Sequence, residues 1–291
     1  LKPTYGRISR YGLIAYASSF DQIGIFANNV ADVAVTLDVI AGPDEFDSTA
    51  IQDIPAGFSE TAPAEKKYKI AYFKDAIDHD ILDGEISTSI NQCFAQLKKD
   101  GHTVEPVEFD LLPHIVPTYY VLTTAEASSN LSRFDGVRYG HRTKEAVKDL
   151  TDFYKLNRSE GFGKEVKRRI MLGTFVLSTG YYDAYFTKAQ QVRRMLIDKT
   201  TAIFKDYDAI IIPTSPSTAF AIGENEHDPI AVYLADIYTV FANLTGVPGI
   251  SVPLFKHSNG LPFGLQIMTN KKEELRLLQL SQLLMEQYST A

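Results

Sequence analysis

The chain has 291 residues, of which 45% are apolar and 22% charged, a composition typical of a globular protein with a sizeable hydrophobic core. Its net charge of −7 argues against a broad nucleic-acid-binding surface but is compatible with a local basic patch. Cys93 is the only cysteine, which excludes an intramolecular disulfide and a cysteine-based zinc site and favours a reducing, cytoplasmic compartment. No apolar run long enough for a membrane-spanning helix is found.

The first part of the chain alternates between strand and helix patterns. In chain order these patterns predict a strand over 18–27, a helix over 29–42, a strand over 68–73, a helix over 83–101 and a strand over 102–109. The first helix has Asn28 or Asn29 as its N-cap and Gly42 at its end. The second has Asp83 as its N-cap and Gly101 at its end, and it places Cys93 beside an apolar face.

The rest of the chain continues the alternation. The predicted elements are helices over 119–130, 164–179 and 183–205, a strand over 208–213, a helix over 228–246, strands over 249–254 and 262–268, and a helix over 272–288. Residues 54–67 are rich in Pro, Ala and charge and are expected to cross the surface. Strands that alternate with helices predict an α/β fold, with a mixed twisted sheet flanked by helices, in a single domain over 1–291.

Local motifs do not identify a reaction. The chain has no G-x-S-x-G nucleophile elbow, and GFGK at 161–164 lacks the spacing of a phosphate-binding loop. The six histidines form no pair four residues apart, so no metal site is expected. The acidic stretch over 75–85 lacks the spacing of a calcium-binding loop and is expected to be a solvated connection.

Several longer segments, taken together, are more informative. They are LKPTYGRISRYGL (1–13), AGPDEFDST (41–49), AEASSNLSRFDGVRYG (125–140), EVKRRIMLGT (165–174), IIPTSPSTAF (211–220) and GLPFGLQIM (260–268). With these segments in this order, the chain resembles members of the amidase signature family. Within that family it is similar to the glutamine-hydrolysing subunits of tRNA-dependent amidotransferases, which convert Glu-tRNA(Gln) to Gln-tRNA(Gln). The resemblance implies an amidase-signature-like fold whose N-terminal part precedes Leu1.

The same resemblance implies where the chemistry resides. Members of the family use a Ser–cis-Ser–Lys triad, and its expected position is upstream of Leu1. No catalytic residue is then expected in this chain, which alone is predicted to be inactive because covalent catalysis needs the nucleophile and its base within hydrogen-bond reach. The resemblance also implies a complex, with a heterotrimer expected, in which ATP, Mg²⁺ and most of the tRNA contact belong to a partner subunit. This chain is expected to hold no cofactor or metal.

Binding of glutamine requires a cation for its carboxylate and a carboxylate for its ammonium group. Carried onto this sequence, the resemblance implies Arg168 for the first role, Asp236 for the second and Tyr119 as a further contact. An arginine suits a carboxylate because its planar guanidinium pairs with both oxygens. Arg169 is the neighbouring alternative to Arg168. The apolar residues around both arginines predict a buried helix, in which each cation needs a partner.

Each of these interpretations has an alternative. Arg168 and Asp236 are also compatible with structural ion pairs, and Tyr119 with a place in the core. Glu126, Ser128 and Ser129 either line the pocket or bond one helix to another, and the aromatic stretch GYYDAYF (180–186) either faces a partner or lies in the core. The whole protein is alternatively a stand-alone amidase or a non-catalytic interaction module. An α/β chain without its first strands exposes a sheet edge, so self-association is expected.

Overall fold

The computed structural model describes residues 1–53, 57–59, 66–223 and 235–289. The chain divides into two compact units. The sheet unit comprises Leu1–Tyr11, Gln22–Val116 and Met195–Ala291, and the helical unit comprises Gly12–Asp21 and Pro117–Arg194. The single domain over 1–291 stays a prediction. None of the helices in the described residues combines the length and the apolar content that crossing a membrane requires.

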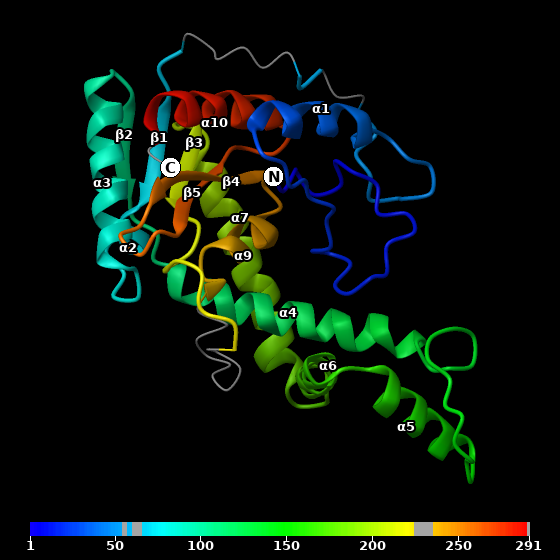
Figure 1. The fold of residues 1–291 in the computed structure, drawn as a ribbon. Helices are drawn as coiled ribbons and strands as arrows, with labels where there is room; N and C mark the ends of the chain where they lie inside the picture. The colour runs from blue at the N-terminus through cyan, green and yellow to red at the C-terminus, as the bar shows by residue number, and fades with distance from the viewer. Residues whose placement is uncertain (54–56, 60–65, 224–234, 290–291) are drawn as a thin grey trace. The chain divides into compact units, whose positions relative to one another are not determined.

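A mixed sheet forms the centre of the sheet unit (Figure 1). Its strands among the described residues are β1 (Lys69–Phe73), β2 (Thr103–Val107), β3 (Ala209–Pro213), β4 (Gly249–Lys256) and β5 (Pro262–Met268), in the order β2-β1-β3-β5-β4. β1 is parallel to both β2 and β3, whereas β5 is antiparallel to β3 and β4. Every residue of β3 is buried, as expected for a central strand covered on both faces. The α/β prediction and the last five predicted strands are therefore confirmed.

Helices cover this sheet. Those of the sheet unit are α1 (Val30–Ile40), α2 (Lys74–Ile77), α3 (Gly84–Lys99), η1 (Leu112–His114), α9 (Thr239–Thr245) and α10 (Glu274–Tyr288). α10 packs on β4 and β5, α1 packs on α10, and α3 packs on β2 (Figure 1). The predicted caps are confirmed: Asn29 accepts the N–H of Asp32 at 2.7 Å, and Asp83 accepts that of Glu85 at 2.8 Å. Cys93 is buried, as expected.

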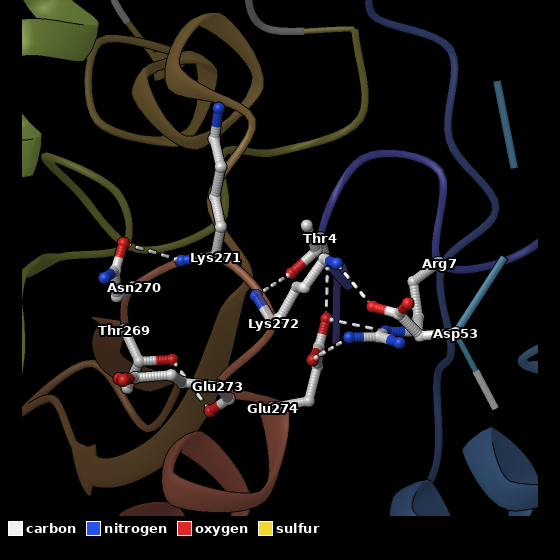
Figure 2. A network of polar contacts seen from close by, with 9 residues as sticks. All are labelled: Thr4, Arg7, Asp53, Thr269, Asn270, Lys271, Lys272, Glu273 and Glu274. Carbon is white, nitrogen blue, oxygen red and sulfur yellow. Dashed lines mark hydrogen bonds and ion pairs between the residues drawn. The ribbon is translucent and has the colours of Figure 1, made fainter. Parts of the chain in front are cut away.

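The loop before α1 is tied to the start of α10. Figure 2 shows Glu274, at the first position of α10, accepting the N–H of Thr4 at 2.9 Å and pairing with the guanidinium of Arg7 at 3.2 Å. The hydroxyl of Thr4 accepts the N–H of Lys272 at 2.9 Å, and the ammonium of Lys272 pairs with Asp53. These bonds fix the loop Leu1–Tyr11 within the sheet unit.

The helical unit is built from segments of α4 (Ile115–Asn130), η2 (Leu131–Arg133), α5 (Leu150–Gly161), α6 (Lys164–Val176), η3 (Asp183–Thr187) and α7 (Lys188–Ile203). The backbone of α6 approaches α4 closely at Gly173, where an added Cβ would lie 1.9 Å from the carbonyl oxygen of Thr124. Ser128 on α4 and Thr174 on α6 share a hydrogen bond of 2.9 Å. For Ser128, the helix-to-helix bond offered by the sequence analysis is therefore confirmed.

Three predictions about elements are wrong or incomplete. Residues 18–27 form no strand, because the carboxylate of Asp21 accepts the N–H groups of Tyr16 and Ala17 and closes a turn. The predicted helix over 183–205 begins instead with the π-helical η3, and α7 follows it. The predicted helix over 228–246 lies partly outside the described residues, and its described part ends in α9.

The aromatic stretch 180–186 does not lie in the core. Tyr181, Tyr182 and Tyr185 have exposed fractions of 43–45%. The rings of Tyr181 and Tyr185 contact each other and that of Phe175 on α6, with centroid distances of 4.4–6.1 Å. The core interpretation of this stretch is therefore wrong.

Candidate functional site

A cavity of about 340 Å³ lies in the sheet unit, beyond the carboxyl end of β3. Hydroxyl groups line it from the segment that follows β3 and from β4: Thr214, Ser215, Ser217, Thr218 and Ser251. Its remaining walls include Phe220 and Phe263. The volume lies at the lower end of the range for small-molecule sites. A cavity of this kind offers a small polar molecule neutral donors and acceptors between apolar walls.

The strands fix the hydroxyls of this cavity. Thr214 follows directly after β3 and shares a hydrogen bond of 2.8 Å with Ser251 on β4. Gly264 on β5 allows the close approach of β4, because a Cβ there would lie 2.0 Å from the carbonyl oxygen of Val252. These hydroxyls were not among the predicted site residues, although four of them follow a buried strand within five residues.

Asp236 directly follows Ala235, which is one of the residues that line this cavity. It is half-buried and occupies the turn before α9, where its carbonyl oxygen accepts the N–H of Val240 at 3.3 Å. Tyr238 anchors this turn: its buried hydroxyl donates to the carbonyl of Ala76 at 2.9 Å, and its own carbonyl accepts a hydrogen bond from Gln266 at 3.0 Å. Asp236 therefore lies on backbone that is fixed to the sheet.

Arg168 and Arg169 lie in the helical unit, on α6, in different environments. The side chain of Arg168 is 45% exposed, and its Nη1 donates to Glu165 at 2.9 Å. Arg169 is half-buried: its Nε donates to Glu165 and its Nη1 to the hydroxyl of Tyr16, both at 2.9 Å. The guanidinium of Arg169 also lies 5.6 Å from the ring centroids of Tyr16 and Tyr120, close enough for cation–π attraction.

Electrostatics distinguish the two arginines further. Burial of Arg169 lowers the pKa of its guanidinium, but the hydrogen bonds to Tyr16 and Glu165 outweigh burial and raise that pKa. Arg169 is therefore held as a cation by groups of its own unit, whereas Arg168 presents its guanidinium at the surface with one carboxylate partner.

The prediction that α6 is buried is wrong. Of its residues, Gly173 and Val176 are buried, whereas Met171, Leu172 and Phe175 have exposed fractions of 73%, 43% and 43%. An apolar pattern all round a helix is typical of burial, but α6 packs against α4 on one side, where Gly173 allows close approach. Arg168, which is 45% exposed, therefore needs no buried partner.

Tyr119 lies on α4 in the helical unit and is half-buried among aromatic rings. Its ring contacts Phe20 edge-on at a centroid distance of 5.8 Å and Tyr120 at 5.4 Å. Such edge-to-face contacts stabilise a fixed ring orientation. Tyr119 is therefore positioned by its packing.

A polar network that the sequence analysis did not predict fixes the turn 16–21 against α4 and α7. Glu126 accepts the N–H of Ser19 at 2.9 Å and also its hydroxyl proton. Arg193 donates to the hydroxyl of Ser19 at 2.8 Å and to its carbonyl at 2.9 Å, and its guanidinium lies 4.1 Å from the ring centroid of Phe20. Glu126, which was predicted to line a pocket or to bond helices, bonds to this turn.

The predicted site residues are divided between the two units. Asp236 belongs to the sheet unit, and Arg168, Arg169 and Tyr119 belong to the helical unit. The convergence of Arg168 and Asp236 on one ligand stays a prediction. In the part of the chain that the structure describes, His, Cys, Asp and Glu side chains form no group of three that could hold a metal ion.

A protein-family model and several known proteins match most of this chain in sequence. The family model described as Amidase matches residues 1–278. The A subunit of the glutamyl-tRNA(Gln) amidotransferase of Brevibacillus brevis is 51% identical over 282 residues, which are 97% of this chain and 57% of that protein. The corresponding protein of Koribacter versatilis is 49% identical over 97% of this chain and 58% of its own length.

A solved structure agrees with these sequence matches. The crystal structure of the A subunit of the glutamyl-tRNA(Gln) amidotransferase from Thermotoga maritima superposes with a TM-score of 0.78 at 40% identity, over 99% of this chain and 57% of that one. The chain therefore spans somewhat more than half the length of the relatives that it matches. The match over nearly all of its own residues, in sequence and in fold, shows that this chain belongs to the amidase family.

Proposed function

We propose that this chain is the glutamine-positioning part of the ammonia-generating subunit of a tRNA-dependent amidotransferase. The observation that carries the proposal is the 51% identity to the corresponding subunit of a glutamyl-tRNA(Gln) amidotransferase over 97% of the chain. In the proposed reaction, the whole subunit hydrolyses the side-chain amide of glutamine. A partner protein, which would hold ATP and Mg²⁺, activates glutamate esterified to tRNA, and the ammonia released here amidates it. The site of action proposed for the complex is the cytoplasm.

The residues have separate roles in this proposal. Arg168 pairs with the α-carboxylate of glutamine, Asp236 with its α-ammonium group, and Tyr119 limits its position. The partial exposure of Arg168 supports its role, because a guanidinium at the surface can exchange water for a ligand carboxylate. Arg169 is assigned a supporting role, since Tyr16 and Glu165 already occupy two of its donors. The hydroxyl-lined cavity next to Ala235 supports a polar substrate near Asp236.

The covalent step is assigned to residues outside this chain. A serine of the preceding segment would attack the carboxamide carbon, and the amide nitrogen would leave as ammonia after taking up a proton. Water would then hydrolyse the acyl-enzyme and release glutamate. The residues described here would hold the two charged groups of glutamine so that the amide meets the nucleophile, which lowers the barrier through orientation. The chain alone is accordingly proposed to be inactive.

The test measures ammonia release by the full-length protein, meaning this chain together with its proposed preceding segment. We expect hydrolysis of glutamine, a rate that responds to the tRNA-binding partner, and no hydrolysis by residues 1–291 alone. Activity on aryl or aliphatic amides without the partner, and none on glutamine, would instead identify a stand-alone amidase. Hydrolysis of glutamine by residues 1–291 alone would refute the assignment of the nucleophile.

A further inference from the structure

Positive charge is concentrated in the helical unit. This unit carries 14 Lys and Arg against 9 Asp and Glu, whereas the sheet unit carries 15 against 27. The helical unit is therefore basic within a chain whose net charge is −7. A local basic surface on an acidic protein attracts polyanions to one place and not to the whole molecule.

Part of this charge lies in the segment 133–148, which we call the basic loop. It joins α4 to α5 through η2 (Figure 1). Five basic side chains in it are all exposed, and two acidic residues accompany them. The basic residues are Arg133, Arg138, Arg142, Lys144 and Lys148. One of the two acidic residues, Asp135, accepts the N–H of Val137 at 2.8 Å and so takes part in a turn.

Asn157 on α5 holds the first part of the basic loop in one conformation. Asn157 on α5, which is 2% exposed, donates to the carbonyl of Asp135 at 2.8 Å and accepts the N–H of Thr143 at 2.7 Å. Gly136 has a φ of +79°, and a Cβ there would lie 2.3 Å from the amide nitrogen of Asn157. Only glycine fits this turn, because it combines a left-handed backbone with a close neighbour.

A second set of bonds fixes the other half of the loop. Glu160 on α5 pairs with His141 at 2.7 Å and accepts the hydroxyl proton of Thr143 at 2.9 Å. The guanidinium of Arg142 lies 5.5 Å from the ring centroid of Phe153. The basic side chains therefore project from a fixed backbone, and little conformational entropy of the loop is lost when it binds a partner.

Exposed aromatic residues accompany the charges. Tyr139 is 46% exposed, and its ring contacts Phe134 edge-on at a centroid distance of 5.2 Å. Tyr154 on α5 is 36% exposed. RNA-binding surfaces typically combine basic side chains, which contact phosphates, with exposed aromatic rings, which stack on unpaired bases.

We propose that the basic loop binds the sugar–phosphate backbone of tRNA directly, so that this chain contributes its own RNA contact. The inference rests on the proposed function for the choice of RNA. The basic side chains pair with phosphates, and Tyr139 stacks on an unpaired base. Because phosphate contacts release counterions, the affinity should fall with salt by a slope proportional to the number of phosphates neutralised.

The test uses the complete complex, with all subunits and the full-length form of this chain. A variant with Arg138→Gln, Arg142→Gln and Lys144→Gln is compared with one in which Lys98, Lys99 and Lys205, exposed lysines of the sheet unit, are changed to Gln. Fluorescence anisotropy gives the Kd for labelled tRNA at several salt concentrations. We expect the loop variant to bind roughly tenfold or more weakly, with a salt slope reduced by about 2–3. The control variant should bind like the wild type.

Two further measurements separate a loss of phosphate contacts from a general loss of function. A variant with Arg138→Lys and Arg142→Lys should keep the wild-type salt slope, since the charges remain. Glutamine hydrolysis in the absence of RNA should be unchanged in the loop variant, so that loss of the proposed function is detected separately. Equal affinity and slope in the loop and control variants would overturn the proposal. So would loss of a partner protein from the complex of the loop variant, because the surface would then belong to a protein interface.

Discussion

Arg7 and Glu274 form an ion pair between segments that are 267 residues apart in the sequence. Nη2 of Arg7 lies 3.2 Å from Oε2 of Glu274, and the two side chains are 5% and 0% exposed (Figure 2). Because both side chains are almost completely buried, each charge depends on protein partners for its stabilisation. The pair therefore links the conformation of the loop Leu1–Tyr11 to the start of α10.

Removal of one partner of the Arg7–Glu274 ion pair should destabilise the fold. We expect Arg7→Met to lower the free energy of unfolding by about 3–5 kcal/mol, since the carboxylate of Glu274 would remain buried without its cation. Combining it with Glu274→Leu should restore part of the loss. The measurement is urea unfolding. As a control, Arg276→Met removes the pairs of a partly exposed arginine with Glu273 and Asp208 and should cost about 1 kcal/mol or less. Equal losses for the two arginines would contradict the account.

Asp47 should make stability depend on pH in the acid range. Burial raises the pKa of this carboxyl, but hydrogen bonds from Thr49 and Arg10 outweigh burial and lower the pKa from 3.8 to about 2. The stabilisation is therefore present above pH 4 and lost as the pH falls through about 2. Asp47→Asn should lower the free energy of unfolding by about 2 kcal/mol at neutral pH.

The difference between the wild type and Asp47→Asn should shrink below pH 4 and vanish below about pH 2. Unfolding curves across this range provide the measurement. Asp78→Asn, which removes an exposed pair with Lys74, is the control and should have little effect on stability, because solvent screens such a pair. A difference for Asp47→Asn that does not change with pH would contradict the assignment.

Gly173 should be intolerant of a side chain. A Cβ at this position would lie 1.9 Å from the carbonyl oxygen of Thr124 and 2.8 Å from the Cβ of Ser128. Gly173→Ala should therefore force α4 and α6 apart and lower the free energy of unfolding by about 1–3 kcal/mol, even though alanine favours helix. Gly163→Ala is the matched control, because a Cβ there has no neighbour within 4 Å. A neutral Gly173→Ala variant would show that the helices are not in this contact.

Cys93 should report on unfolding. It is 6% exposed, and burial raises the pKa of its thiol to about 11. Thiolate is the reactive form, so a thiol reagent at pH 8 should label the folded protein much more slowly than the chain in guanidinium chloride. The labelling rate should rise with denaturant as the population of open molecules rises. Labelling of the folded protein at the rate of the unfolded chain would contradict the burial.

The sequence predicted those elements whose signals are local. The caps at Asn29 and Asp83 and the four apolar residues of β3 place α1, α3 and β3 almost to the residue. The strand predicted over 18–27 failed because apolar content does not reveal that the side chain of Asp21 bonds the backbone of Tyr16 and Ala17. α5 was missed because its apolar positions are few, although Asp149 caps it.

The candidate site was less accessible to sequence analysis. The chemistry of Arg168 and Asp236 came from a family resemblance, and the sequence had no means of separating exposed Arg168 from half-buried Arg169. That difference arises from Tyr16, which lies 153 residues from Arg169 in the chain. The cavity hydroxyls were visible as a cluster after β3, but their enclosure depends on β4 and β5, which follow later in the sequence.

The central claim is that Arg168 and Asp236 bind the two charged groups of one glutamine molecule. The most direct test measures kcat/KM of the full-length protein for glutamine and for two analogues, one lacking the α-carboxylate and one lacking the α-ammonium group. The wild type should prefer glutamine by roughly 10- to 100-fold over each analogue, the range expected for a hydrogen bond to a charged group. Arg168→Gln should abolish the first preference alone, and Asp236→Asn the second alone, whereas Lys167→Gln should preserve both. Variants that keep the wild-type preferences, or that lose both together, would contradict the claim.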